Sequence, residues 1–185
     1  MVFIPPTRGV RRAQELWYFA NEAIGMLVFE RHPPSPLLRR LLRMPVWLFR
    51  ARLGWLLDRQ VLLLTTIGRR SGLPRTTPVG YLHDPVADVY YLTAGWGGAV
   101  NWLGNVRACS RVRIRVRGRE RGAEAAPASP EGALAVLAAY TERNPFARRI
   151  WSRWIGVGFD GTPESYERVR AQFPTVAVTP SSGAD

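Results

Sequence analysis

The chain contains no lysine, and all 26 of its basic residues are arginines. This absence excludes a Schiff-base lysine, a lysine general base and the lysine of a P-loop from its chemistry. A preference for GC-rich codons would give the same composition, so the imbalance alone does not identify a ligand.

Metal-binding side chains are also scarce. His32, His83 and the single cysteine Cys109 lack the spacing of a zinc or iron site, so we expect no intrinsic metal. One cysteine excludes an intrachain disulfide and fits a reducing compartment. No signal peptide and no run of about 18 uncharged apolar residues is visible, which predicts a cytoplasmic protein.

Carboxylates are missing from three long stretches of a chain whose formal net charge is +12. None occurs between Glu30 and Asp58, between Asp58 and Asp84, or between Asp88 and Glu120. These windows hold most of the arginines, so we expect an anionic partner along the first two thirds of the chain.

A length of 185 residues, of which 46% are hydrophobic, predicts one folded domain with a sizeable core. We divide it into a helical segment 1–57, a β-rich domain 58–180 and a disordered tail 181–185. Helical periodicity, interrupted by prolines, runs through residues 10–57 and is accompanied by arginine and tryptophan. These helices either contact the inner face of the cell membrane or pack on the domain with their arginines in water.

Strand patterns dominate the middle of the chain. Short apolar or alternating runs predict strands over 61–67, 75–83, 89–93, 111–117, 119–126 and 175–179. Helices are expected over 101–108, 130–143 and 145–154, and after a cap at Thr162. The order predicts an α+β fold in which an antiparallel sheet or small barrel is flanked by helices.

A basic turn between the first two strands is the strongest local motif. Its two glycines allow the backbone to turn its amides inward as a nest for an anion. Its three arginines and one serine add donors suited to phosphate or carboxylate. The alternative is an ordinary hairpin turn with solvated arginines. The motif consists of Gly68, Arg69, Arg70, Ser71, Gly72 and Arg75.

A glycine-rich loop, 95–98, is followed by a short helix carrying Asn101, Trp102 and Asn105. Glycines permit close approach of a flat ligand, and Trp96 or Trp102 could form an aromatic wall, although Trp102 could equally be a core residue. The loop lacks the third glycine of a dinucleotide fingerprint. The chain also lacks a nucleophile elbow and paired carboxylates, so a cofactor would have to supply any difficult chemistry.

In order and spacing, these motifs resemble the deazaflavin-dependent nitroreductase family. The resemblance rests on residues 62–75, the glycine-rich loop and the run from Trp102 to Ala108, and it covers about residues 45–127, with a weaker extension to Pro180. It implies a split β-barrel that binds the 5-deazaflavin coenzyme F420. It also implies hydride transfer from the reduced cofactor to quinones, nitro compounds or other electron-poor acceptors.

The resemblance also implies site residues. The basic turn would hold the phosphate and oligoglutamate tail, the next strand would line the cofactor channel, and two later segments would lie against the deazaflavin. In that order the residues are Gly68, Arg69, Arg70, Ser71, Gly72 and Arg75; Thr76, Thr77 and Pro78; then Thr93, Ala94, Gly95, Trp96 and Gly97 with Asn101, Trp102 and Asn105. Hydride transfer depends on positioning more than on a protein acid or base, so scarce histidine is no obstacle.

Two features depart from the family pattern. Many members have a small residue and then lysine where this chain has Gly95 and Trp96, so we expect Trp96 to reshape the pocket. Members also place tyrosines from the C-terminal helices near the substrate. Here Tyr166 is the candidate for a catalytic, substrate-side residue, whereas Tyr140 is expected in the core.

Three functional classes fit these observations to different degrees. An F420-dependent oxidoreductase fits the motifs best, and a non-catalytic F420- or lipid-binding protein of the same fold is the alternative. A nucleic-acid-binding module would use the arginines. They are spread over several elements without a recognised motif, so we expect no nucleic-acid partner.

Overall fold

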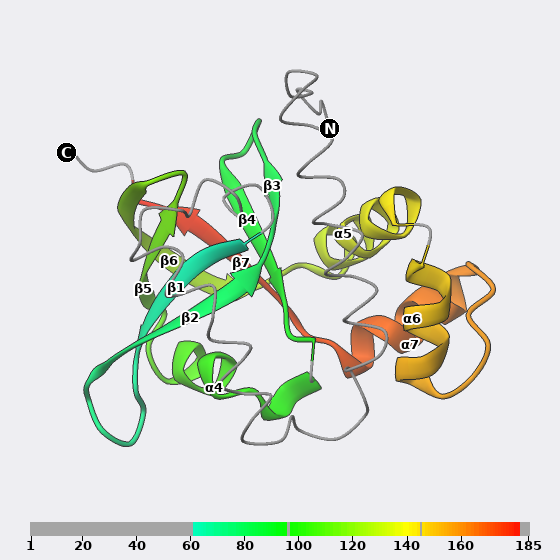
Figure 1. Ribbon diagram of the computed structural model, residues 1–185, viewed down its shortest axis with the longest axis horizontal. Helices are drawn as coiled ribbons and strands as arrows, with labels where there is room; N and C mark the ends of the chain where they lie inside the picture. The colour runs from blue at the N-terminus through cyan, green and yellow to red at the C-terminus, as the bar shows by residue number, and fades with distance from the viewer. Residues whose placement is uncertain (1–60, 96, 145, 182–185) are drawn as a thin grey trace.

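The structure is a computed structural model that describes residues 61–95, 97–144 and 146–181 (Figure 1). The predictions made for the helical segment 1–57, for Trp96 and for nearly all of the C-terminal tail therefore lie outside the described residues.

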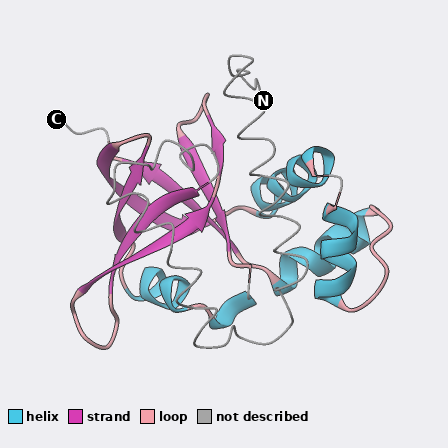
Figure 2. Cartoon of the chain, viewed as in Figure 1, coloured by secondary structure: helices cyan, strands magenta, loops and turns pink. Residues whose placement is uncertain are grey.

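The described residues form a seven-stranded sheet in which all neighbouring strands are antiparallel. The strand order is β2-β1-β5-β6-β7-β4-β3. The sheet curls so that β2 also approaches β4, which gives the half-barrel seen in Figure 2. The predicted α+β fold with a split barrel is confirmed. The strands are β1 (Val61–Ile67), β2 (Pro74–Gly80), β3 (Leu82–Asp84), β4 (Val89–Thr93), β5 (Arg111–Val116), β6 (Arg119–Pro127) and β7 (Thr175–Pro180).

The single strand predicted over residues 75–83 is two strands. β2 pairs with β1 up to Gly80, and β3 pairs with β4 from Leu82 onward. The chain changes partner at Tyr81, which a local pattern of apolar residues does not reveal. The other strand predictions agree with the structure to within a residue or two.

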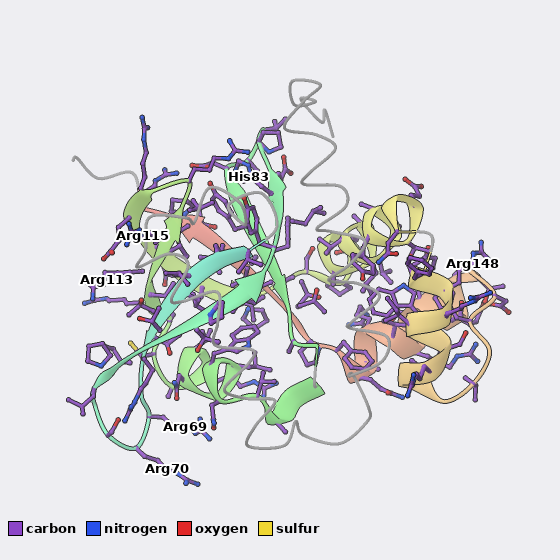
Figure 3. All side chains as sticks on the ribbon, in the orientation of Figure 1. Arg69, Arg70, His83, Arg113, Arg115 and Arg148 are labelled. Carbon is purple, nitrogen blue, oxygen red and sulfur yellow. The ribbon has the colours of Figure 1, made fainter. Side chains whose placement is uncertain are left out.

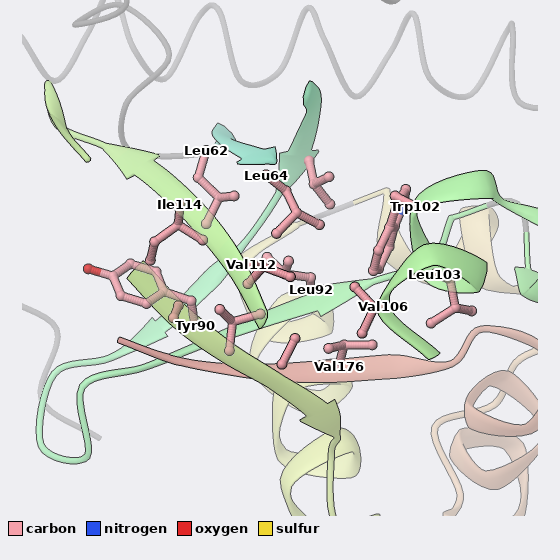
Figure 4. Close-up of a cluster of buried hydrophobic side chains, with 14 of the residues drawn as sticks. Leu62, Leu64, Tyr90, Leu92, Trp102, Leu103, Val106, Val112, Ile114 and Val176 are labelled. Atoms are coloured by element: carbon pink, nitrogen blue, oxygen red, sulfur yellow. The ribbon is translucent and has the colours of Figure 1, made fainter. Parts of the chain in front are cut away.

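The core lies inside the curl of the sheet (Figure 4). On β5, Val112, Ile114 and Val116 are buried whereas Arg111 and Arg113 are exposed, as the alternation predicts. Fully burying each such apolar side chain contributes about 1.5–3 kcal/mol. Leucines on β1 and β4, valines on β7 and three residues of the helix α4 (Asn101–Ala108) complete this core.

Three helices form a second, smaller core. They are α5 (Pro130–Arg143), α6 (Ala147–Ile155) and α7 (Pro163–Gln172). They lie between β6 and β7 in the chain, although β6 and β7 are neighbours in the sheet. Ser129 and Thr162 cap α5 and α7 by accepting backbone N–H bonds at 3.0 and 3.3 Å, as predicted from the sequence.

Candidate functional site

The basic turn joins β1 to β2 and is held by hydrogen bonds within itself. The amide of Gly68 donates to the carbonyl of Leu73 at 2.9 Å, and that of Gly72 donates to the carbonyl of Gly68 at 2.8 Å. Gly72 has a φ of +66°, and a Cβ on Gly68 would lie 2.7 Å from Oγ of Ser71. The left-handed backbone at Gly72 favours glycine, and Gly68 leaves room for the hydroxyl of Ser71.

The predicted nest of free amides is wrong. Four amides of the turn donate to acceptors within it, and that of Arg69 donates to Oδ1 of Asn105 at 3.2 Å. An anion at this turn therefore meets side chains rather than a ring of unpaired N–H groups. The four internally bonded amides are those of Gly68, Ser71, Gly72 and Leu73.

Arg69 fastens the turn to α4. Its Nη1 donates to Oδ1 of Asn105 and to the carbonyl of Asn101, both at 3.2 Å. Asn105, only 6% exposed, donates in turn from Nδ2 to Oγ1 of Thr66 at 3.1 Å. The two motifs that the sequence shows separately are thus one hydrogen-bonded unit. We call Thr66, Arg69, Asn101 and Asn105 the hairpin–helix latch.

Arg70 and Arg75 are exposed on the same hairpin (Arg70 is at its tip in Figure 3). Neither guanidinium forms an ion pair or hydrogen bond with another described residue. The sequence from residue 59 to 83 and that from 89 to 119 contain no carboxylate. Within the described part of the chain, Arg70 and Arg75 therefore present unpaired positive charge to an anionic ligand.

The register of β2 divides the three residues predicted to line one channel. Arg75 lies opposite Thr66 and Thr77 opposite Leu64, so both are on the face that meets α4 and the core. Thr76 is on the other face, where its Oγ1 lies 3.0 Å from Oγ1 of Thr65. Pro78 shares that outer face, so of the three only Thr77 lies on the same face of β2 as Arg75.

Several residues predicted to contact the deazaflavin are bonded or buried within the fold. Thr93 Oγ1 is 3.1 Å from Oγ1 of Thr175 on β7. Ala94 is fully buried, so it has no surface to offer a ligand. Trp102 is 7% exposed and belongs to the core, which confirms the alternative considered for it. Gly95 and Gly97 lie in and after the turn that follows β4, and Asn101 is exposed at the start of α4.

Comparison with models of known protein families shows to which family the chain belongs. The family model of F420H2-dependent quinone reductases matches residues 41–148, more than half of the chain. The chain belongs to this family. It is therefore an F420H2-dependent reductase, and its cofactor is coenzyme F420. The match ends in the first turn of α6, so the rest of that helix, α7 and β7 lie beyond it.

Solved structures give weaker likenesses. An F420-H2 dependent reductase shares 20% identity over 65% of this chain and 94% of its own, with a TM-score of 0.47. An F420 reductase shares 13% over 67% and 88%, with a TM-score of 0.38. The heme storage protein HutZ from Vibrio cholerae shares 16% over 77% and 92%, with a TM-score of 0.45. No curated protein matches the chain. The assignment of the chain to its family therefore rests on the family model that matches residues 41–148.

The side chains of the hairpin fit the cofactor. The tail of F420 is anionic through its phosphate and glutamates, and arginine presents a forked set of donors that matches such oxygens. In the reductase, Arg70 and Arg75 are exposed and are not engaged by another described residue, whereas Arg69 is already bonded to α4. The first two are therefore the better candidates for the tail, and Arg69 for positioning the hairpin.

Tyr166 lies apart from this hairpin. It is on α7, where its ring meets that of Phe159 edge-on at 5.0 Å, and α7 packs on α5 and α6 (Figure 1). Its predicted catalytic role finds no support in this placement. Tyr140 packs against the same helical core, as expected, and its hydroxyl accepts a hydrogen bond from Nδ2 of Asn144 at 2.8 Å.

Thr66 belongs to the hairpin–helix latch but was not predicted from the sequence as a site residue. Its side chain is 1% exposed and accepts the hydrogen bond from Asn105. The signal was present, because Thr66 follows Leu62 and Leu64 at strand spacing and is a polar residue in a core position. A buried hydroxyl needs a partner, and that need points to a second polar side chain nearby.

A separate polar cluster ties the β3–β4 turn to β6. Nε2 of His83 lies 3.0 Å from Oδ1 of Asp88, and Arg121 donates to Oδ2 of Asp88 at 2.9 Å. The His83 ring also stacks on Tyr90 with 4.2 Å between centroids. Burial alone would raise the pKa of Asp88, but the hydrogen bonds and charges of His83 and Arg121 outweigh it and hold that pKa below its usual 3.8.

Proposed function

We propose that this reductase transfers a hydride from reduced F420 to a quinone, with nitro compounds as further acceptors. The observation that carries the proposal is the pair of exposed guanidiniums, Arg70 and Arg75, on a hairpin fixed by the latch in a region without carboxylates. The family name supports a quinone as the acceptor. When bound, the reduced deazaflavin supplies the hydride.

The residues of the chain would bind the cofactor and orient it. Arg70 and Arg75 would hold the anionic tail, and Thr77, on the same face of β2 as Arg75, would line the channel. The latch fixes the hairpin that carries Arg75 to α4. A cofactor bound to that hairpin would be held in one orientation, and hydride transfer depends on such positioning. Neither β1, β2 nor α4 carries a histidine or carboxylate, so no proton-transfer step is assigned to them.

The test begins with a titration of the full chain with oxidised F420, followed by turnover of reduced F420 with menadione and with a nitroaromatic compound. A variant with both Arg70→Ala and Arg75→Ala is compared with a control carrying Arg111→Ala and Arg119→Ala. The control removes the same charge from exposed positions on β5 and β6. Each charge-assisted contact contributes about 1.5–3 kcal/mol, so the first variant, which loses two, should bind at least about 100-fold more weakly.

Each result has a separate meaning. Absence of F420 binding would overturn the proposal. Binding without turnover of either acceptor would instead favour a cofactor carrier. An equal loss of affinity in both double variants would show that net charge, rather than this hairpin, attracts the cofactor. A higher kcat/KM for the nitroaromatic than for menadione would overturn the choice of quinone.

A further inference from the structure

The outer face of β1 carries a leucine that is buried outside the core of the half-barrel. Leu62 and Leu64 belong to that core, and Thr66 points the same way, toward α4. Leu63 alternates with these residues, so it lies on the outer face, yet it is only 7% exposed. Its burial requires a cover that the interior of the half-barrel does not supply.

The described neighbours of Leu63 lie beside it in the sheet. It is opposite Pro78 on β2 and Arg115 on β5. The helix α4 also contacts β1, but it does so on the inner face, where Asn105 bonds to Thr66. Arg115, half-buried and labelled in Figure 3, has a side chain long enough to reach across the leucine. It is therefore the alternative cover that a test must separate.

Exposure along this outer face falls with distance from the hairpin. Ile67, at the hairpin end of β1, is 40% exposed, Thr65 is half-buried and Leu63 is buried. On β2, Thr76 is exposed, whereas Pro78, opposite Leu63, is half-buried. The cover thus lies over the first half of β1, where the chain enters the sheet.

Residues 41–57, which precede β1 and lie outside the described residues, are rich in apolar side chains. They hold three arginines and no other charged residue. A stretch this apolar needs a surface on which to bury its side chains. Val46, Phe49, Leu53 and Leu56 follow one another at helical spacing, which predicts one continuous apolar stripe.

The length and the connection of this segment suit it to the outer face. Residues 58–60 join it to β1, and they let Leu57 lie at most about 14 Å from Val61. As a helix, residues 46–57 would be about 18 Å long, close to the roughly 23 Å of the seven-residue β1. The outer positions of β1 and β2 carry no charge, since Arg75 is on the inner face.

We propose that residues 41–57 pack on the outer face of β1 and β2, over Leu63 and Pro78. So short a connection presents the segment to this face at an effective concentration on the order of millimolar, above that of a free partner. The family model also begins at residue 41, which places the segment within the unit that the family shares. The inference does not depend on F420 binding. Its consequence is that β1, which leads into the cofactor hairpin, is packed on both faces.

The test measures how fast a maleimide labels single cysteines introduced into the full chain in a Cys109→Ser background. Leu63→Cys should react at least about tenfold more slowly than Ile67→Cys, because a covered thiol reacts only when its cover opens. A third protein adds Arg115→Ala to Leu63→Cys and should be labelled as slowly as Leu63→Cys alone.

A stripe variant then identifies the cover. Val46→Ser, Phe49→Ser and Leu53→Ser together should speed the labelling of Leu63→Cys at least about tenfold, because the segment no longer gains from burial. The same three changes should leave the labelling of Ile67→Cys unaltered. A control with Leu16→Ser, Phe19→Ser and Leu27→Ser should alter neither rate. Circular dichroism and F420 titration of each variant separate loss of the fold, or failure of the cofactor proposal, from loss of the cover.

A crosslink gives a second test that leaves the segment unchanged. A benzophenone maleimide attached to Thr65→Cys, in the same Cys109→Ser background, should join on irradiation to a peptide from residues 41–57 of the same chain. Mass spectrometry of the digested product identifies that peptide.

Several results would overturn the proposal. Equal labelling of Leu63→Cys and Ile67→Cys would show that nothing covers the face. Fast labelling after Arg115→Ala, or slow labelling in the stripe variant, would assign the cover to the arginine or to another segment. Protection that falls on dilution, or a crosslink between two chains, would assign it to a second copy. Protection that requires added phospholipid vesicles would assign it to a bilayer.

Discussion

The guanidinium of Arg69 occupies the space in which a side chain on Gly104 would stand. A Cβ built on Gly104 would lie 2.8 Å from Nη1 and 3.0 Å from Cζ of Arg69. Glycine within a helix costs about 0.5–1 kcal/mol relative to alanine, so this glycine needs a packing reason. The reason is the hairpin, whose arginine lies against the surface of α4.

This contact predicts a coupling between the two positions. Gly104→Ala should fail to stabilise the wild type, because the gain in helix propensity is offset by displacement of Arg69. In an Arg69→Ala background the same change should stabilise by about 0.5–1 kcal/mol. Urea unfolding of the four proteins measures the coupling. Equal effects of Gly104→Ala in both backgrounds would show that the contact has no energetic weight.

Asn105 should be the least replaceable residue of the latch. Asn105→Ala removes the donor to the Thr66 hydroxyl, which keeps only its 3.5 Å bond to the carbonyl of Arg75, and the acceptor of the Arg69 amide. The loss should cost about 1–3 kcal/mol of unfolding free energy. Hydrogen exchange of the Arg69 amide should accelerate in the same variant. Asn101→Ala, at an exposed position, should cost much less. A similar cost for both asparagines would contradict this account.

Adjacent threonines on β2 should respond differently. Thr77→Val changes the face shared with Arg75, whereas Thr76→Val changes the outer face. We expect Thr77→Val to weaken F420 binding several-fold and Thr76→Val to leave it unchanged, with titration calorimetry as the measurement. The opposite result would place the cofactor on the outer face of the sheet.

The Asp88 cluster predicts a pH-dependent contribution to stability. Because the pKa of Asp88 is lowered in the folded protein, its contribution is present above the unfolded pKa of about 3.9 and is lost as pH falls through the folded pKa. Asp88→Asn should therefore lower Tm at neutral pH, and the difference should shrink as the pH falls through the lowered pKa of Asp88. A Tm difference that is constant across this range would refute the assignment.

The backbone at Asp88 provides a separate control. Its φ of +48° is left-handed, a conformation that asparagine tolerates better than alanine. Asp88→Ala should therefore cost about 1 kcal/mol more than Asp88→Asn, and this excess should not vary with pH.

Patterns that involve only residues close together in the sequence predicted most of the strands and helices. The alternation of β5 and the caps at Ser129 and Thr162 depend on neighbours within a few residues, so the sequence displays them directly. The latch does not follow from such rules, because Arg69 and Asn105 are 36 residues apart and meet only once the sheet has formed. The predicted amide nest was wrong for the same reason, since its acceptors are supplied by the folded turn and by α4.

The segment carrying α5, α6 and α7 leaves the sheet and returns to it at almost the same point. The amide of Ala128 donates to the carbonyl of Thr175 at 3.0 Å, so the two ends of the segment are joined at its base. Lengthening a loop whose ends already meet costs little additional entropy. Evolution or design can therefore enlarge, shorten or exchange the helices while the half-barrel and its hairpin keep their geometry. The segment of α5, α6 and α7 is in this sense an exchangeable insertion between two neighbouring strands of the half-barrel.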